Sequence, residues 1–143
     1  MDDRTFFREV AASLGCDERR AEGVTFVVFG ELRDRLSPEE RSDVEAQLST
    51  GLKRLWRVGD VGRDPNHVRR MEFLGRVRHR AVLADDAAAE RAARAVFACL
   101  QRALGSPTGR EGEAWDVLSQ LPMDLKDLWL DASVRSTLTP SQA

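Results

Sequence analysis

Two ten-residue stretches of the sequence share the same pattern and end in Leu-Trp. Residues 47–56 read Gln-Leu-Ser-Thr-Gly-Leu-Lys-Arg-Leu-Trp, and residues 120–129 read Gln-Leu-Pro-Met-Asp-Leu-Lys-Asp-Leu-Trp. At a shift of 73 positions, seven of the thirteen residues from Val44 to Trp56 recur. At a shift of 68, six of the sixteen residues from Ala21 to Leu36 recur. Because self-similarity at a fixed spacing is the signature of repeated structural units, the sequence predicts a tandem duplication.

The shift between the two halves changes only where loops are expected. The first helices align at a shift of 67, where Phe6 and Val10 meet Phe73 and Val77. The shift then grows by one residue near Ala84 and by five within 105–113. Insertions confined to loops are what a duplicated unit tolerates. The alternative is that two amphipathic stretches share leucines by chance, but the Gln-Leu, Leu-Lys and Leu-Trp matches in one register argue against it.

Apolar residues recur at intervals of three to four nearly everywhere, which indicates helices rather than strands. Gly15 is expected to end a first helix, and Asp17 is a good N-cap for the next. Ser37-Pro38 starts a third helix, with Glu40 placed for a capping box. The predicted fold class is all-α, a helical bundle of two pseudo-symmetric halves.

The predicted organisation has four parts: residues 1–57 form a first helical repeat, 58–66 a linker, 67–132 a second repeat and 133–143 a flexible tail. Since about 65 residues bury little surface alone, the two repeats are expected to share one core. The aromatic and leucine residues that recur are interpreted as structural anchors of that core. They are Phe29, Phe97, Leu48, Leu121, Trp56 and Trp129.

The recurring pattern resembles a known family. It comprises Phe-x-x-x-Val, then Ala-Glu-x(5)-Val-Phe-x-x-Leu-x-x-x-Leu, then Gln-Leu-Pro-x-x-Leu-Lys-x-Leu-Trp. These motifs are similar to family 2267 of the domains of unknown function (DUF2267), small bacterial and archaeal helical proteins with two such halves. The resemblance covers residues 6–131, although Ser49 replaces the usual proline in the first half. It implies an all-helical fold and carries no activity or catalytic residue with it.

Composition limits the classes of function. The 143 residues carry a formal net charge of −2, so no global field draws the protein to nucleic acid or to an anionic membrane. Two cysteines, Cys16 and Cys99, make no disulfide framework. The acidic N-terminus is unlike a signal peptide, and no apolar run is long enough to span a bilayer. We therefore expect a cytoplasmic protein with no membrane association.

No constellation of catalytic, cofactor-binding or metal-ligating residues is predicted, so an enzyme is the least favoured class. His67 and His79 are twelve residues apart, too far for one helical metal face. Cys16 lies beside a helix start, where a reactive thiolate is conceivable, whereas Cys99 reads as a core residue. The carboxylates of one helix start are interpreted as solvated side chains favoured by the helix dipole. They are Glu39, Glu40, Asp43 and Glu45.

Arginine is concentrated between residues 57 and 80, a segment that contains seven arginines and three acidic residues. Arg69, Arg76 and Arg80 lie on one stripe of the expected helix, because offsets of seven and eleven return to a similar angle. They are candidate contacts for a partner or an anion. The simpler interpretation is an exposed helix whose arginines pair with acids of the other half or of a second subunit.

These observations favour a non-enzymatic protein-interaction or scaffold module, whose partner is another protein or a second copy of the chain. One alternative is a nucleic-acid-binding regulator that uses the arginine-rich helix. Another is a binder of small molecules between the halves.

Overall fold

A computed structural model describes residues 1–58, 69–106 and 108–138. Over these ranges the fold is all-α and has no strand, as predicted. The described residues form eight helices: α1 (Asp3–Leu14), α2 (Glu18–Arg33), α3 (Pro38–Ala46), α4 (Thr50–Arg57), α5 (Arg70–Arg80), α6 (Asp86–Ala103), α7 (Gly112–Gln120) and α8 (Met123–Leu138). None of the helices in these ranges is long and apolar enough to cross a membrane.

The start and stop signals act at the predicted residues. Gly15 ends α1 with a left-handed φ of 67°, a conformation that costs glycine little. The Asp17 side chain caps α2 by accepting the Arg20 backbone N–H at 2.7 Å. Ser37 caps α3 in the same way, with Pro38 in the first turn. These local signals therefore divide the chain into helices before any tertiary contact is considered.

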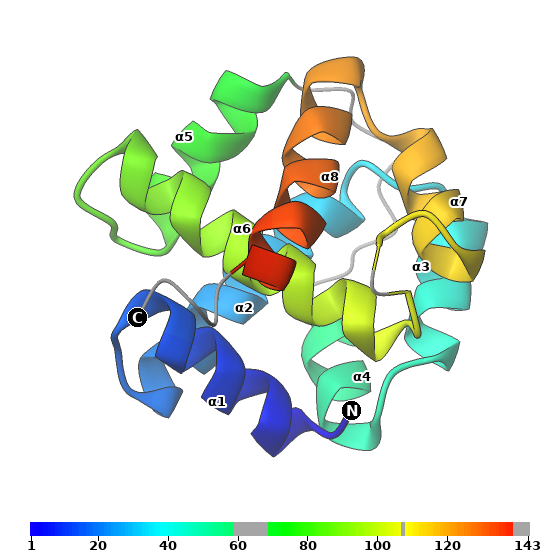
Figure 1. Ribbon diagram of the computed structural model, residues 1–143, viewed down its shortest axis with the longest axis horizontal. Coiled ribbons are helices and arrows are strands. Elements are labelled where there is room, and N and C mark those ends of the chain that lie inside the picture. Colours follow the sequence, from blue (N-terminus) through cyan, green and yellow to red (C-terminus); the bar gives the residue numbers. More distant parts are fainter. Residues whose placement is uncertain (59–68, 107, 139–143) are drawn as a thin grey trace.

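The two sets of four helices contact one another in matching pairs (Figure 1). Within the first set, α1 packs on α2, and α4 packs on both α2 and α3. Within the second set, α5 packs on α6, and α8 packs on both α6 and α7. Between the sets, α1 packs on α6 as α2 packs on α5, while α2 meets α6 and α3 meets α7. Exchanging the two sets leaves these contacts unchanged, although α1 also packs on α4 and the corresponding α5–α8 contact is less extensive. That arrangement supports the predicted duplication, which itself stays a prediction.

Two aromatic clusters anchor the core. In the first half the Phe29 ring lies 5.7 Å from Phe6 and 5.2 Å from Trp56, measured between centroids. In the second half the Phe97 ring lies 5.9 Å from Phe73 and 5.1 Å from Trp129. All these rings are buried, as are Leu48 and Leu121. Aromatic rings at these separations add to the stabilisation from burial alone.

Each tryptophan is held by two hydrogen bonds of the same kind. Trp56 Nε1 donates to the Arg41 carbonyl, and Trp129 Nε1 donates to the Gly109 carbonyl, both at 3.1 Å. The carbonyl of Trp56 accepts from the Arg33 guanidinium, and that of Trp129 accepts from Gln101 Nε2. Arg33 and Gln101 are 68 positions apart, the shift that relates α2 to α6 in the sequence. Both indole N–H groups are thereby satisfied inside the core.

The last helix is longer than the sequence suggested. The second repeat was expected to end at residue 132 and a flexible tail to begin at 133, yet α8 continues to Leu138. Ala132 and Ser133 are buried, and α8 packs along α6, so tertiary contact extends the helix past the repeated motif. The expected linker at 58–66 lies outside the described residues except for Val58, as do the last five residues of the tail.

Candidate functional site

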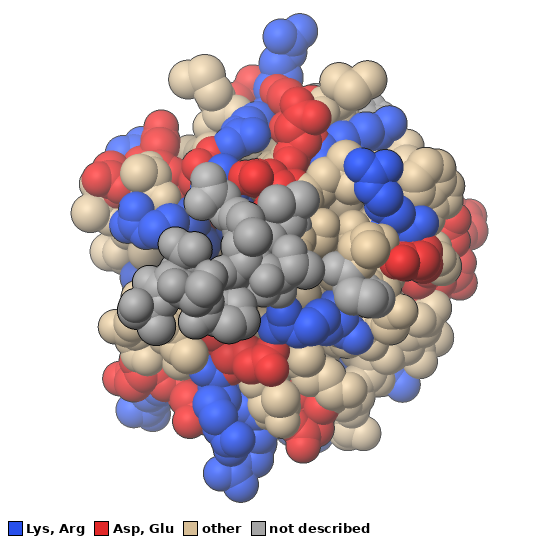
Figure 2. Space-filling model, in the orientation of Figure 1, with Lys and Arg blue, Asp and Glu red and all other residues tan. Residues whose placement is uncertain are grey.

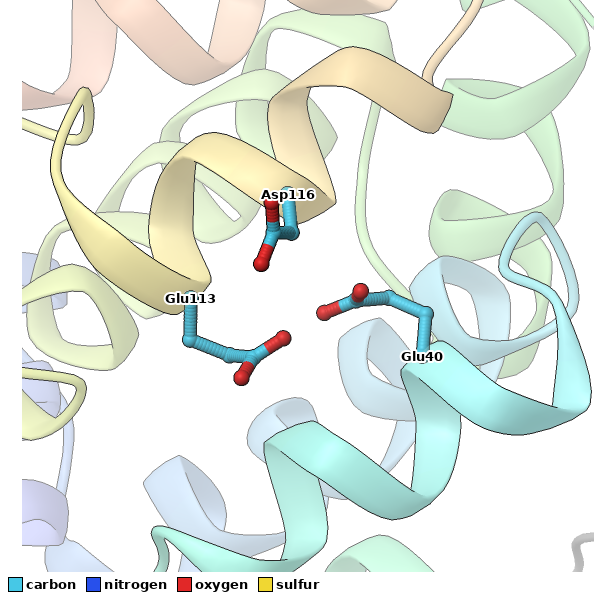
Figure 3. Close-up of side chains that lie close together, drawn as sticks. All are labelled: Glu40, Glu113 and Asp116. Carbon is cyan, nitrogen blue, oxygen red and sulfur yellow. The ribbon is translucent and has the colours of Figure 1, made fainter.

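An acidic cluster lies where the two halves meet through α3 and α7. Glu40 comes from α3, and Glu113 and Asp116 come from α7. Each residue contributes a carboxylate oxygen, and these oxygens all lie within 4.8 Å of one another. Figure 3 shows the three side chains pointing toward one another across the gap between the helices. We call these three residues the acidic cluster.

The capping of α3 explains why Glu40 faces the cluster. The Ser37 hydroxyl accepts the Glu40 backbone N–H at 3.2 Å, which is half of the predicted capping box. The other half would need the Glu40 carboxylate to accept the Ser37 N–H. That N–H is instead donated to Gln120 Oε1, at the end of α7, at 2.8 Å. Because Gln120 replaces it at the helix start, the Glu40 carboxylate turns toward α7.

Glu40 is buried, and no described residue supplies a compensating cation. It is 4% exposed, and its Oε2 atom has no hydrogen-bond partner among the described residues. Glu113 Oε1 accepts from Gln47 Nε2 at 2.9 Å, while Glu113 Oε2 is also buried without a partner. Within the described ranges no arginine, lysine or histidine forms an ion pair with any cluster residue. The cluster therefore concentrates negative charge that these side chains do not neutralise.

This environment raises the pKa of the Glu40 carboxyl to about 9. Burial is the main cause, since it disfavours the charged form. A hydrogen bond with Glu113 and the negative charges of Glu113, Asp116 and Asp43 raise the pKa further. Glu40 is therefore protonated at neutral pH as long as no cation occupies the cluster.

The sequence prediction for Glu40 was wrong, because it read the residue as a solvated carboxylate at a helix start. Glu39 and Asp43 on the same helix are exposed, as expected. A usable signal was nevertheless present. Glu40 and Asp43 recur as Glu113 and Asp116 at the same shift of 73 that relates the tryptophan motifs. Glu40 and Glu113, at matched positions, come together because the helices that carry them, α3 and α7, contact one another.

The arginine stripe is partly engaged within the protein. Arg80 Nη1 lies 2.7 Å from Glu31 Oε2, and Arg76 Nη1 lies 4.0 Å from Glu31 Oε1. Arg69, just before α5, is exposed. Neighbouring arginines of α5 are also paired, Arg70 with Glu90 and Arg78 with Asp86. On the face drawn in Figure 2, acidic and basic side chains of the described residues are interspersed. A role in binding a partner or an anion stays a prediction.

Arg35 forms the buried end of the Glu31 network. Its side chain is fully buried, with Nη1 3.3 Å from Glu31 Oε1. The guanidinium carbon lies 5.1 Å from the centre of the Phe73 ring on α5, a cation–π geometry. Burial lowers the pKa of Arg35, while the charge of Glu31 opposes that change. Sequence reasoning missed this arginine, because the apolar stripe of α2 ends one residue after it.

The cysteines and the described histidine offer no reactive group. Burial raises the pKa of the Cys99 thiol to about 12, and burial also raises that of Cys16. Both thiols are therefore protonated at neutral pH and weakly nucleophilic. His79 is exposed near the end of α5, and His67 lies outside the described residues.

A pocket of about 290 Å³ lies beside α4 and is lined by Thr50, Lys53, Arg54, Arg57 and Val58. All five residues come from the first half, so this pocket is not the inter-half site expected of a small-molecule binder. Its lining residue Arg57 pairs with Glu45 at 2.6 Å. Small-molecule binding between the halves stays a prediction.

The comparison with protein families bears on the whole chain. Residues 3–128 match the model of the family described as "Uncharacterized conserved protein (DUF2267)". The chain belongs to the DUF2267 family. A search of curated proteins found no match. Family membership agrees with the resemblance that the repeated motifs carry, and the family's description assigns no activity.

Proposed function

We propose that this DUF2267 protein is a non-enzymatic protein-interaction module of the cytoplasm. The observation that carries the proposal is a pair of exposed methionines, Met71 at the start of α5 and Met123 at the start of α8. Their side chains are 78% and 74% exposed. Large apolar side chains that stay in water are informative when they gather at one place, since such places favour contact with another molecule.

The two methionines belong to the same end of the molecule. The Arg70 backbone N–H donates to Asp124 Oδ2 at 3.0 Å, which joins the first turn of α5 to the first turn of α8. Met71 follows Arg70 and Met123 precedes Asp124 in the chain. Figure 1 shows these two helix starts meeting at one edge of the bundle. Unbranched, polarizable methionine side chains adapt to varied apolar surfaces and are frequent at binding sites.

The first half supplies an internal comparison. At the shifts that relate the halves, Arg4 corresponds to Met71 and Thr50 corresponds to Met123. The equivalent end of the first half therefore presents polar side chains. Since the helix framework does not require an apolar side chain at these two positions, the methionines of the second half are candidates for function. The partner that they fit is a protein with an exposed apolar segment.

The experiment places a photo-crosslinking amino acid at position 71 or 123 and, as matched controls, at position 4 or 50. Expressed in the native organism and irradiated, the first pair is expected to trap one defined protein that the controls do not trap. The captured protein is then purified and titrated with the unmodified chain. Met71→Ser and Met123→Ser together should weaken its binding at least about tenfold without unfolding the chain, since exposed substitutions change stability by about 0.5 kcal/mol or less.

Equal crosslinking at all four positions, or unchanged affinity of the double variant, would remove the basis of the proposal. Recovery of nucleic acid by the chain, with a loss of binding in Arg69→Ala, Arg76→Ala and Arg80→Ala, would favour the regulator instead. The arginine substitutions and the methionine substitutions lie on separate side chains, so the two outcomes are distinguishable.

A further inference from the structure

We propose that the acidic cluster of Glu40, Glu113 and Asp116 is a binding site for a hard divalent cation, Ca²⁺ in preference to Zn²⁺. The ion would join α3 of the first half to α7 of the second. This site is independent of the methionine pair and goes beyond the interaction function proposed above.

The donor set selects the class of ion. All three side chains offer carboxylate oxygens, and hard cations such as Ca²⁺, Mg²⁺ and Mn²⁺ take oxygen ligands. Zn²⁺ sites use mainly sulfur and nitrogen ligands, which this cluster does not offer. Oxygens within 4.8 Å of one another fit around Ca²⁺, whose ligands lie about 2.3–2.6 Å away and can be about 5 Å apart on opposite sides.

Burial gives a second observation that points to a ligand. Clustering alone is common among exposed acids, but the Glu40 side chain is more than nine-tenths buried, and its ionised Oε2 atom accepts no hydrogen bond from the described residues. Figure 3 shows this carboxylate aimed into the space between the helices, where Glu113 and Asp116 also point. Buried polar atoms are nearly always satisfied, so an orphaned carboxylate oxygen implies a missing partner such as an ion.

The surroundings fit an ion that enters from solvent. Glu113 is half-buried and Asp116 is exposed, so the cluster opens toward water on the α7 side. Water molecules can supply the ligands that three carboxylates leave open, as is usual for hard cations. Gln47 Nε2 donates to Glu113 Oε1, which fixes that carboxylate and leaves its Oε2 free for an ion.

The two halves both contribute negative charge to the α3–α7 contact. Glu40 and Glu113 are corresponding residues, as are Asp43 and Asp116, so each half contributes a Glu-x-x-Asp segment to the α3–α7 contact. Like charges this close repel one another, and a dication converts that repulsion into an attraction between the halves. Ion binding at the cluster therefore stabilises the folded chain as well as the site itself.

The test uses the full-length chain, stripped with EDTA and dialysed. CaCl₂ is titrated by calorimetry and MnCl₂ by electron paramagnetic resonance, which counts bound ions directly. We expect one ion per chain and a rise in Tm with CaCl₂. Glu40→Gln and Asp116→Asn should each weaken binding at least about tenfold, whereas Glu39→Gln, an exposed neighbour on α3, should not.

Asp116→Asn guards against misfolding, because Asp116 is exposed and its loss does not disturb the core. Circular dichroism and the Tm in EDTA establish that each variant folds. Absence of bound Mn²⁺ and Ca²⁺ at millimolar concentration would overturn the proposal and leave Glu40 sharing a proton with Glu113. Binding that persists unchanged in both Glu40→Gln and Asp116→Asn would also overturn it.

Discussion

Two of the helix contacts between the halves, α2–α5 and α1–α6, join corresponding helices but contain different charged residues. At the α2–α5 crossing, buried Glu31 binds Arg80 and contacts Arg76. At the α1–α6 crossing, the residue that corresponds to Glu31 at a shift of 68 is Cys99, which lies 3.7 Å from Glu9 Oε2. At this contact the acid is Glu9 on α1, which pairs with Arg102 on α6.

The apolar residues and the charged residues of the two halves therefore behave differently. Apolar residues at matched positions, such as Phe29 and Phe97, are buried in both halves and pack on matched aromatic rings. The charged residues around them are not matched, and each crossing has its own ion pairs. The buried aromatic residues are therefore alike in the two halves, whereas the charged residues differ.

The largest effect is expected at the two tryptophans, where the halves are most alike. Trp56→Ala and Trp129→Ala should each lower the free energy of unfolding by about 3–5 kcal/mol, because each leaves a large cavity. Urea denaturation measures both losses. If one substitution lowers the free energy of unfolding by less than half as much as the other, the two aromatic clusters do not stabilise the fold equally. That result would contradict the similarity of the two halves.

The next largest loss of stability is expected at the α2–α5 contact and not at the α1–α6 contact. Glu31→Ala removes the carboxylate beside fully buried Arg35 and should cost about 3 kcal/mol, since a buried charge is left uncompensated. Glu9→Ala is the matched control; its side chain is 39% exposed, so the loss should stay below about 1 kcal/mol. Equal losses in urea denaturation would show that the two networks contribute alike despite their different burial.

The acidic cluster should make stability depend on pH when divalent ions are removed with EDTA. The folded-state pKa of Glu40, about 9, exceeds its ordinary value of 4.5, so the folded chain binds more protons than the unfolded chain between these values. Stability from this group is complete below pH 4.5 and declines as pH rises toward 9. Between pH 6 and pH 8, the wild type should lose about 2 kcal/mol relative to Glu40→Gln. Parallel stability curves for the two proteins would contradict the shift.

The smallest effect concerns the turns that end α1 and α5. Gly15 and Val82 correspond at a shift of 67, and both have positive φ, 67° and 54°. A β-branched residue is strained in this region, so Val82→Gly should raise the free energy of unfolding by about 1 kcal/mol. The reciprocal Gly15→Val should lower it by a similar amount. A destabilised Val82→Gly variant, measured by thermal unfolding, would mean that the exposed Val82 side chain makes a contribution of its own.

Much of the fold could be predicted from the sequence because its signals are local. Helix periodicity, the Asp17 and Ser37 caps and the Gly15 stop depend on residues a few positions apart. The acidic cluster could not be predicted in the same way. Its formation depends on α3 meeting α7, and on Gln120 taking the place of Glu40 at the Ser37 N–H.

The burial of Arg35 also could not be predicted from local sequence. Its position just before Leu36, the last residue of the predicted apolar stripe, gave no indication that it would be buried, because burial depends on the approach of Phe73 from the other half. Local spacing identifies the face of a helix, whereas the partner of that face is a tertiary property. Comparing the two halves position by position recovers part of this information, as the recurrence of Glu40 and Asp43 shows.

The bond from Ser37 N–H to Gln120 has a consequence for the order of events during synthesis. A ribosome makes residue 37 more than eighty residues before it makes residue 120. Until Gln120 emerges, the start of α3 lacks one acceptor and Glu40 has no acidic neighbours on α7. The first half is therefore completed only by the second, and a nascent chain stopped short of α7 should leave α3 open to amide exchange and proteolysis.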